Sequence, residues 1–170
     1  MRNRVASAIG TLVFLVLVPG TLAGLIPWWM TGWRVRQPLP FGSPLRVVGA
    51  VLLASGVVFL LHAFVQFVIE GIGTPAPIAP TEHLVVGGLY RHVRNPMYLA
   101  VTATLVGQGL LLGQTSLLVY AGGFLLATNA FVLLYEEPTL RRRFGTEYEE
   151  YRRAVPGWWP RLRPWQPHGK

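Results

Sequence analysis

The sequence predicts an all-α integral membrane protein. We expect four transmembrane helices, two scaffold helices and a helical hairpin, followed by a C-terminal amphipathic helix at the membrane interface. Hydrophobic residues make up 52% of the chain and charged residues only 13%, whereas soluble domains carry about 25% charged residues. The apolar residues gather in long runs, and a helix needs about 20 of them to cross a bilayer. A chain of 170 residues has the length of a single domain.

The first run, Val5–Trp28, follows Arg2 and Arg4, as the apolar part of a signal peptide would. It is longer than a usual signal peptide core, and bulky residues follow the small pair Ala23-Gly24. We therefore predict a retained transmembrane helix.

Three more runs complete the bundle. Val47–Ile69 and Thr115–Tyr135 have the length of a span, and Met97–Gly113 is shorter. Only Gln114 separates the last two runs, which predicts a tight helical hairpin. Small residues also recur four apart, a spacing that lets helices pack closely in lipid. These pairs are Gly20/Gly24, Ala103/Gly107 and Gly123/Ala127.

Four spans would place both termini and the connection Glu70–Pro96 on one side of the membrane. Twelve basic residues lie on that side and three on the other. The twelve are Arg2, Arg4, Arg91, Arg94, Arg141, Arg142, Arg143, Arg152, Arg153, Arg161, Arg163 and Lys170, and the three are Arg34, Arg36 and Arg46. Because cytoplasmic loops are rich in arginine and lysine, we place the termini in the cytoplasm. The same distribution explains the net charge of +8 without a nucleic-acid partner.

The connection Glu70–Pro96 has 27 residues, and loops of this length are usually functional or disordered. It contains apolar residues and a Gly87-Gly88 pair that permits a sharp turn. We expect it to fold against the bundle.

After the last span, Pro138 suits the first turn of a helix. Leu140, Phe144, Tyr148 and Tyr151 form one apolar stripe on it, which predicts an amphipathic helix at the membrane surface. The aromatic tail at residues 155–160 fits either a membrane anchor or a part of a site.

The segment from Gly88 to Tyr98 combines a glycine turn, basic donors and two tyrosines before a helix. Asn95 fits an N-cap position, with Pro96 first in the helix. A helix N-terminus next to Arg94 suits a carboxylate or phosphate. A basic loop anchored to lipid headgroups is the alternative.

Glu136 and Glu137 end the last span, and acidic residues near membrane depth indicate function. They could bind an ammonium group, pair with Arg94 or accept a proton; a helix end that reaches interfacial water is the alternative. His62 and Gln66 share a helix face but do not make a metal site, so we expect hydrogen bonds across the bundle. The chain has no cysteine and no metal site is predicted.

The spacing Gly88-x-Tyr90-x-x-x-Arg94-Asn95-Pro96-x-Tyr98, a hairpin, Glu136-Glu137, and then Leu140-x-x-x-Phe144-Gly145-x-x-Tyr148-x-x-Tyr151-x-x-x-Val155-Pro156 resembles the isoprenylcysteine carboxyl methyltransferase family. The phospholipid methyltransferases are related to it. The resemblance spans residues 85–160.

The resemblance implies a membrane methyltransferase that uses S-adenosylmethionine and acts on a lipophilic small molecule or lipidated substrate among membrane lipids. Residues 1–70 would be the two scaffold helices, and residues 71–170 the cofactor-binding part. The implied catalytic residues are Arg94 and Glu137. The implied cofactor-binding residues are Val86, Gly88, Leu89, Tyr90, Arg94, Asn95, Pro96, Tyr98, Glu136 and Glu137.

Two positions depart from the family pattern. Asn95 stands where many members have histidine. Val132 stands where eukaryotic isoprenylcysteine enzymes have an arginine that holds the acceptor carboxylate, so the acceptor is open. The competing interpretations are an NADPH-dependent sterol reductase-like enzyme and a lipid-binding module without enzymatic activity.

Overall fold

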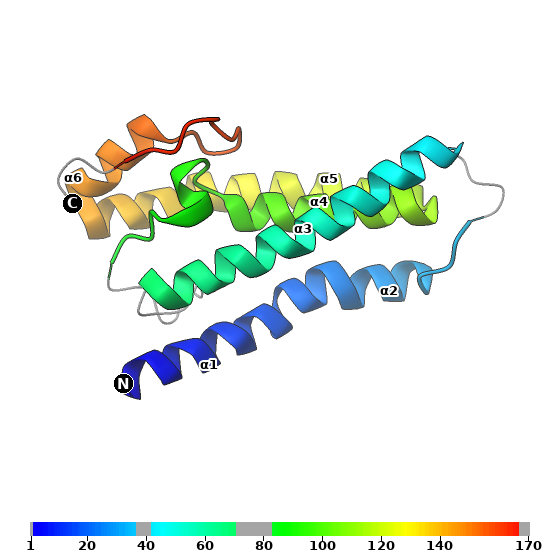
Figure 1. Cartoon of the computed structure of the whole chain (residues 1–170), viewed down its shortest axis with the longest axis horizontal. Helices are drawn as coiled ribbons and strands as arrows, with labels where there is room; N and C mark the ends of the chain where they lie inside the picture. Colours follow the sequence, from blue (N-terminus) through cyan, green and yellow to red (C-terminus); the bar gives the residue numbers. More distant parts are fainter. Residues whose placement is uncertain (1, 37–41, 71–82, 167–170) are drawn as a thin grey trace.

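The computed structural model describes residues 2–36, 42–70 and 83–166, which form helices and short connections without any β-strand. The elements, in chain order, are α1 (Arg2–Leu17), the π-helix η1 (Thr21–Leu25), α2 (Ile26–Thr31), α3 (Gly42–Glu70), the 3-10 helix η2 (Gly88–Arg91), α4 (Pro96–Leu112), α5 (Thr115–Phe131), the π-helix η3 (Val132–Glu136) and α6 (Glu137–Ala154). The long helices form one bundle, with the start of α1 and α6 at the same end (Figure 1). The all-α prediction is confirmed.

Three helical stretches in the described chain are long and apolar enough to cross a membrane: Leu12–Thr31, Gly42–Gln66 and Thr115–Ala154. Helix α4 is apolar but has only 17 residues, fewer than the roughly 20 that a span needs. Large apolar side chains face outward, for example Leu134 at 81% exposure, which suits contact with lipid. The chain is thus a membrane protein, and the prediction of four spans is confirmed for three of them.

The first predicted span is a helix with an irregular middle, in which η1 stands between α1 and α2. A π-helical turn leaves carbonyl groups free for other partners. The carbonyl of Leu22 accepts a hydrogen bond from the Tyr120 hydroxyl at 3.1 Å, and that of Ala23 accepts one from Gln108 Nε2 at 2.7 Å. Side chains of α5 and α4 thereby fix the bulge of the first helix.

Glycines set the close packing of α3 against α4. A Cβ atom added to Gly107 would lie 2.5 Å from the backbone nitrogen of Leu53, and one added to Gly56 would lie 2.8 Å from that of Thr104. Of the small residues singled out by their spacing, Gly107 therefore permits close approach. Gly24 and Gly123 meet nothing within 4 Å, so their pairs do not pack in this way.

The predicted hairpin is present, with α4 ending at Leu112 and α5 beginning at Thr115. Gly113 lies between them at φ +67°, the left-handed conformation that commonly ends a helix. Helix α5 then continues through η3 directly into α6. Helix α6 begins at Glu137 with Pro138 in its first turn, as predicted, and the chain bends later, at Gly145, where φ is +52°.

Helix α6 carries the predicted apolar stripe, but the chain itself covers much of it. Tyr148 and Tyr151 are 2% and 3% exposed and pack with Val155. Leu84, Val86 and Trp165 cover this cluster from the connection and the tail. The stripe therefore fastens the C-terminal part to the bundle, and the prediction that it faces the membrane surface is not confirmed.

Candidate functional site at the end of the bundle

The segment before α4 turns sharply at Gly88, whose φ of +54° favours glycine. A Cβ atom there would lie 3.0 Å from Gln66 Oε1 and from His62 Nε2. The two polar residues of α3 thus pack against this turn, as the absence of a glycine side chain allows. The turn leads through η2 to Arg94 and Asn95.

Arg94 joins the segment before α4 to α6. Its Nη1 donates to Glu137 Oε1 at 2.6 Å and to the Tyr148 hydroxyl at 3.0 Å. Glu137 Oε2 also lies 3.4 Å from Arg152 Nε and 3.8 Å from Arg141 Nη2. Because the side chains of Arg94 and Glu137 are only 15% and 11% exposed, water screens this pair weakly.

One donor of Arg94 has no partner among the described residues. Its Nε is buried and makes no hydrogen bond. An unsatisfied buried donor costs about 1–3 kcal/mol, and an anionic or carbonyl oxygen of a ligand would remove that cost.

The C-terminal tail runs back along the segment before α4, where Figure 1 shows it in red beside the green chain. The backbone N–H groups of Arg94 and Asn95 donate to the carbonyls of Pro156 and Gly157 at 2.9 and 3.3 Å. Arg161 and Trp165 extend the contact through backbone bonds to His92 and Arg91. The tail is therefore part of the site region and not only an anchor.

Asn95 occupies the N-cap position of α4, with Pro96 next in the chain, as the sequence predicts. Its side chain makes no capping bond; its Nδ2 donates instead to the Gly157 carbonyl at 3.1 Å. The predicted N-cap position is confirmed, and the Asn95 side chain joins the start of α4 to the tail.

Tyr98 and Glu136 meet on the other side of the site. The Tyr98 hydroxyl donates to Glu136 Oε2 at 3.0 Å, which links α4 to η3. The Trp158 ring lies 6.4 Å from the Tyr98 ring, centre to centre. The tail therefore reaches this pair as well.

Tyr90 is buried in η2 at 7% exposure. Burial, and secondarily the Tyr151 hydroxyl, raises the pKa of Tyr90 well above its usual value. Tyr90 therefore stays protonated at neutral pH, and its backbone carbonyl accepts a hydrogen bond from Tyr151 at 2.8 Å.

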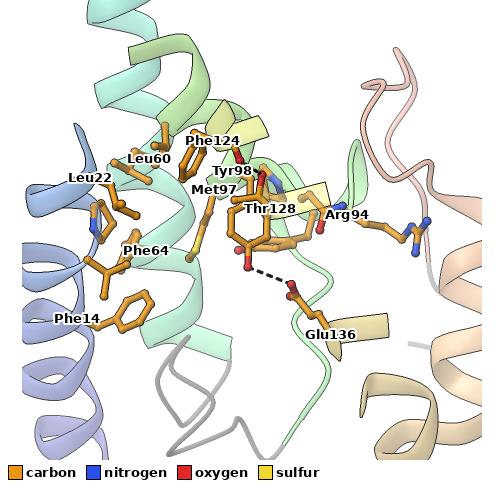
Figure 2. A pocket seen from close by; sticks show the side chains of 16 residues that line it. Phe14, Leu22, Leu60, Phe64, Arg94, Met97, Tyr98, Phe124, Thr128 and Glu136 are labelled. Atoms are coloured by element: carbon orange, nitrogen blue, oxygen red, sulfur yellow. Dashed lines mark hydrogen bonds between the residues drawn. The ribbon is translucent and has the colours of Figure 1, made fainter. Parts of the chain in front are cut away.

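Two cavities adjoin at these residues. A cavity of about 80 Å³, which we call the polar cavity, lies at the junction with α6, and one of about 160 Å³, the apolar cavity, lies between the helices. The residues that line both are Tyr90, Arg94, Asn95 and Glu136. Figure 2 shows the apolar cavity, with Phe14, Leu22, Leu60 and Phe64 on one side and the Tyr98–Glu136 hydrogen bond on the other.

The structure brings together seven of the ten predicted cofactor residues around the two cavities: Tyr90, Arg94, Asn95, Pro96, Tyr98, Glu136 and Glu137. Val86, Gly88 and Leu89 line neither of them. Val86 packs against the α6 cluster, Leu89 against the cluster of Ala63, Val85 and Tyr90, and Gly88 against α3.

Sequence reasoning missed several residues of the cavities. Tyr148 and Tyr151 line the polar cavity, although their spacing indicated only an apolar stripe. Val132, which the sequence analysis singled out only as a departure from the family pattern, lines the same cavity and is 2% exposed. The aromatic residues Phe14, Phe64 and Phe124 come from three apolar spans, and nothing in their local sequence marks them as cavity residues.

The comparisons with known proteins agree with the motifs. The family model described as phospholipid methyltransferase matches residues 44–147, more than half of the chain. This range includes nearly all of α3, the segment before α4, the hairpin and the first part of α6. No curated protein and no solved structure matches the chain significantly. The chain therefore belongs to the phospholipid methyltransferase family, a family of membrane methyltransferases.

Proposed function

We propose that this protein transfers a methyl group from S-adenosylmethionine to a lipophilic acceptor within the membrane. The observation that carries this proposal is the meeting of a polar and an apolar cavity at four shared residues. A charged, water-soluble donor and an apolar acceptor need such adjoining compartments. Family membership supports methyl transfer as the reaction.

The polar cavity has groups that match the donor. S-adenosylmethionine carries a carboxylate, an ammonium and a sulfonium. The orphaned Nε of Arg94 fits the carboxylate, and the Glu136 carboxylate, which lines this cavity, fits the ammonium. Tyr148 and Tyr151 offer aromatic faces, which attract cations. When bound, the donor would supply an electrophilic methyl group.

Arg94 and Glu137 would act by holding their surroundings in place. The pair ties the segment before α4 to α6, and the tail bonds to the neighbouring backbone. Such preorganisation aligns donor and acceptor, and alignment alone can supply about 7–11 kcal/mol of barrier lowering.

The acceptor would occupy the apolar cavity, which α1, α3, α4 and α5 line with apolar side chains. This cavity resembles in size a cavity of about 150 Å³ that holds benzene, so it suits the reactive end of an acceptor rather than a whole lipid. The remaining chain would extend between the helices into the bilayer.

We further propose that α4 completes a set of four spans and that the site faces the cytoplasm. Helix α4 is apolar and packs closely along α3, which is long enough to cross the membrane. The strongly uneven distribution of arginine supports this orientation. The donor would then enter from the cytoplasm.

Calorimetry on the purified protein in detergent tests the donor. We expect saturable binding of S-adenosylhomocysteine and no binding of NADP(H). Arg94→Ala should abolish this binding, because it removes both the orphaned donor and the partner of Glu137. Binding of NADP(H) alone would identify a reductase-like enzyme, and binding of neither would favour a lipid-binding module.

A further inference from the structure

A second hollow lies at the end of the bundle opposite to the candidate site. This α2 hollow is open and has a volume of about 320 Å³. The end of α2 and the residues after it line it: Trp28, Trp29, Met30, Thr31, Gly32 and Arg34. Figure 1 shows this end of α2 far from α6. Because the first apolar stretch ends at Thr31, the hollow lies where the chain leaves the apolar part of the bilayer.

Hydrogen bonds to the hairpin hold the segment after α2. The Gln114 side chain donates to the Arg34 carbonyl at 2.8 Å. The Arg36 backbone N–H donates to the carbonyl of Leu112, the last residue of α4, at 2.9 Å. The segment is therefore part of the bundle.

Trp33 adopts a conformation that its contacts enforce. Its φ is +52°, in the left-handed region that residues other than glycine rarely adopt. Its backbone N–H donates to the Thr31 hydroxyl at 3.2 Å, and its indole N–H donates to Gln108 Oε1 at 3.2 Å. Such conformations gather at functional sites.

The Arg34 side chain reaches back over Gly32. A Cβ atom added to Gly32 would lie 3.6 Å from Arg34 Nε and 3.7 Å from its Cγ. Arg34 therefore brings a cation into a hollow whose other large side chains include the indole rings of Trp28 and Trp29.

The sequence places no carboxylate in the segments that meet at this end. All seven acidic residues are glutamates, and none lies within residues 1–69 or 83–135. Arg34, Arg36 and Arg46 belong to this end, whereas the ion pairs of the described residues lie at the other end. A counterion for these arginines therefore comes from outside the chain.

We propose that the α2 hollow binds the headgroup of an anionic phospholipid, such as phosphatidylglycerol. The planar guanidinium of Arg34 matches two phosphate oxygens, and the exposed Arg36 adds a second positive charge. Trp28 and Trp29 are 51% and 80% exposed, and tryptophan rings commonly lie at headgroup level. A zwitterionic headgroup would bring an ammonium close to the arginines, and this repulsion favours a headgroup with net negative charge.

The acyl chains of this lipid would lie along the apolar surface of the first helix. Leu25, one turn before Trp28 and Trp29, is 56% exposed. The lipid would fasten the first helix at the membrane surface, far from the candidate site. The proposal therefore does not depend on the proposed function.

Native mass spectrometry of the full chain in detergent tests this lipid site. The probes are phosphatidylglycerol and phosphatidylcholine with the same acyl chains, and inorganic phosphate as a competitor. We expect phosphatidylglycerol to bind about tenfold more tightly than phosphatidylcholine, because its charge is not offset by an ammonium. Equal affinity for the two lipids would overturn the proposal. Displacement of the lipid by an equal concentration of phosphate would also overturn it, since that result indicates a site for free anions.

Paired arginine variants locate the bound lipid. Arg34→Gln/Arg36→Gln should weaken the binding of the first phosphatidylglycerol at least fivefold. The matched control, Arg142→Gln/Arg143→Gln, removes the same charge from two exposed positions on α6 and should change this binding less than twofold. Equal effects of the two variants would show that net charge alone attracts the lipid, and would overturn the assignment.

Tryptophan variants locate the lipid independently of charge, and they give an answer even if an arginine variant does not fold. Trp29→Ala should weaken phosphatidylglycerol binding at least threefold, because it removes an exposed ring from the hollow. Trp159→Ala, at a ring that is 83% exposed at the other end, is the control and should bind as the wild type does. An unchanged affinity in Trp29→Ala would place the lipid elsewhere.

Discussion

Arg94 connects three parts of the chain that are distant in sequence. Its side chain bonds to Glu137 and Tyr148, and its backbone N–H bonds to Pro156. A buried ion pair contributes to stability only when its geometry is good and its other donors are satisfied. Since the Nε of Arg94 has no partner among the described residues, the arrangement gives up some stability at the place where a ligand would bind.

Glu137→Gln tests the ion pair between Arg94 and Glu137. It leaves the Arg94 guanidinium without its anionic partner, so we expect a loss of about 1–3 kcal/mol in stability and at least a tenfold weaker binding of S-adenosylhomocysteine. Thermal unfolding and calorimetry in detergent measure the two effects. Glu147→Gln, on the exposed face of α6, should change neither quantity. Equal effects of both variants would contradict the role of the Arg94–Glu137 ion pair in stability and binding.

The resemblance to the methyltransferase family implied that Arg94, Tyr98 and the two glutamates form one site, and the structure brings them around adjoining cavities. The different partners of Glu136 and Glu137 could not be predicted, because the side chains that each carboxylate meets depend on how the helix is placed against its neighbours. The hydrogen bond from Asn95 to Gly157 could not be predicted either, because it joins residues far apart in sequence.

At the scale of elements, two contacts hold the site. Helix α3 packs on α4 through glycines, and the tail packs on the segment before α4. The periodic apolar runs predicted the helices well because burial in lipid demands them. The π-helical turns and the bend at Gly145 left no such pattern in the sequence.

Gly107→Ala tests the packing of α3 on α4. The added Cβ would lie 2.5 Å from a backbone atom of α3, and overpacking of this kind costs about 1–3 kcal/mol. We expect a lower midpoint of thermal unfolding in detergent. Gly123→Ala is the matched control, because nothing lies within 4 Å of that position; a larger loss there would contradict the packing.

Gly157→Val tests the contact of the tail. A Cβ atom at this position would lie 3.1 Å from Arg94 Nη2, and the branched side chain would displace the guanidinium. We expect binding of S-adenosylhomocysteine to weaken at least tenfold in calorimetry. Trp159→Ala, at a ring that is 83% exposed, should bind normally. Normal binding by the Gly157 variant would show that the tail does not support the site.

Across the whole molecule, most of the described arginines lie at one end of an apolar bundle. Composition and the distribution of arginine predicted this arrangement, because charged groups are expelled from the bilayer. The apolar cavity could not be predicted, since its aromatic residues come from spans whose mutual rotation the sequence does not reveal.

Labelling of single cysteines tests the orientation, as the chain has no cysteine of its own. Leu162→Cys, at a side chain that is 97% exposed, should react with a membrane-impermeant maleimide only in inside-out vesicles. Val35→Cys, at the other end and 41% exposed, should react only in right-side-out vesicles. The reverse pattern would place the site outside the cytoplasm.

The central claim is that this bundle methylates an apolar acceptor in the membrane. Membranes containing the wild-type chain or the Arg94→Ala variant are incubated with S-adenosylmethionine that carries a labelled methyl group, and the lipids are extracted. We predict a labelled lipid-soluble product with the wild type and none with the variant. Equal labelling by the two, or no labelled product with a wild-type chain that binds S-adenosylhomocysteine, would contradict the account.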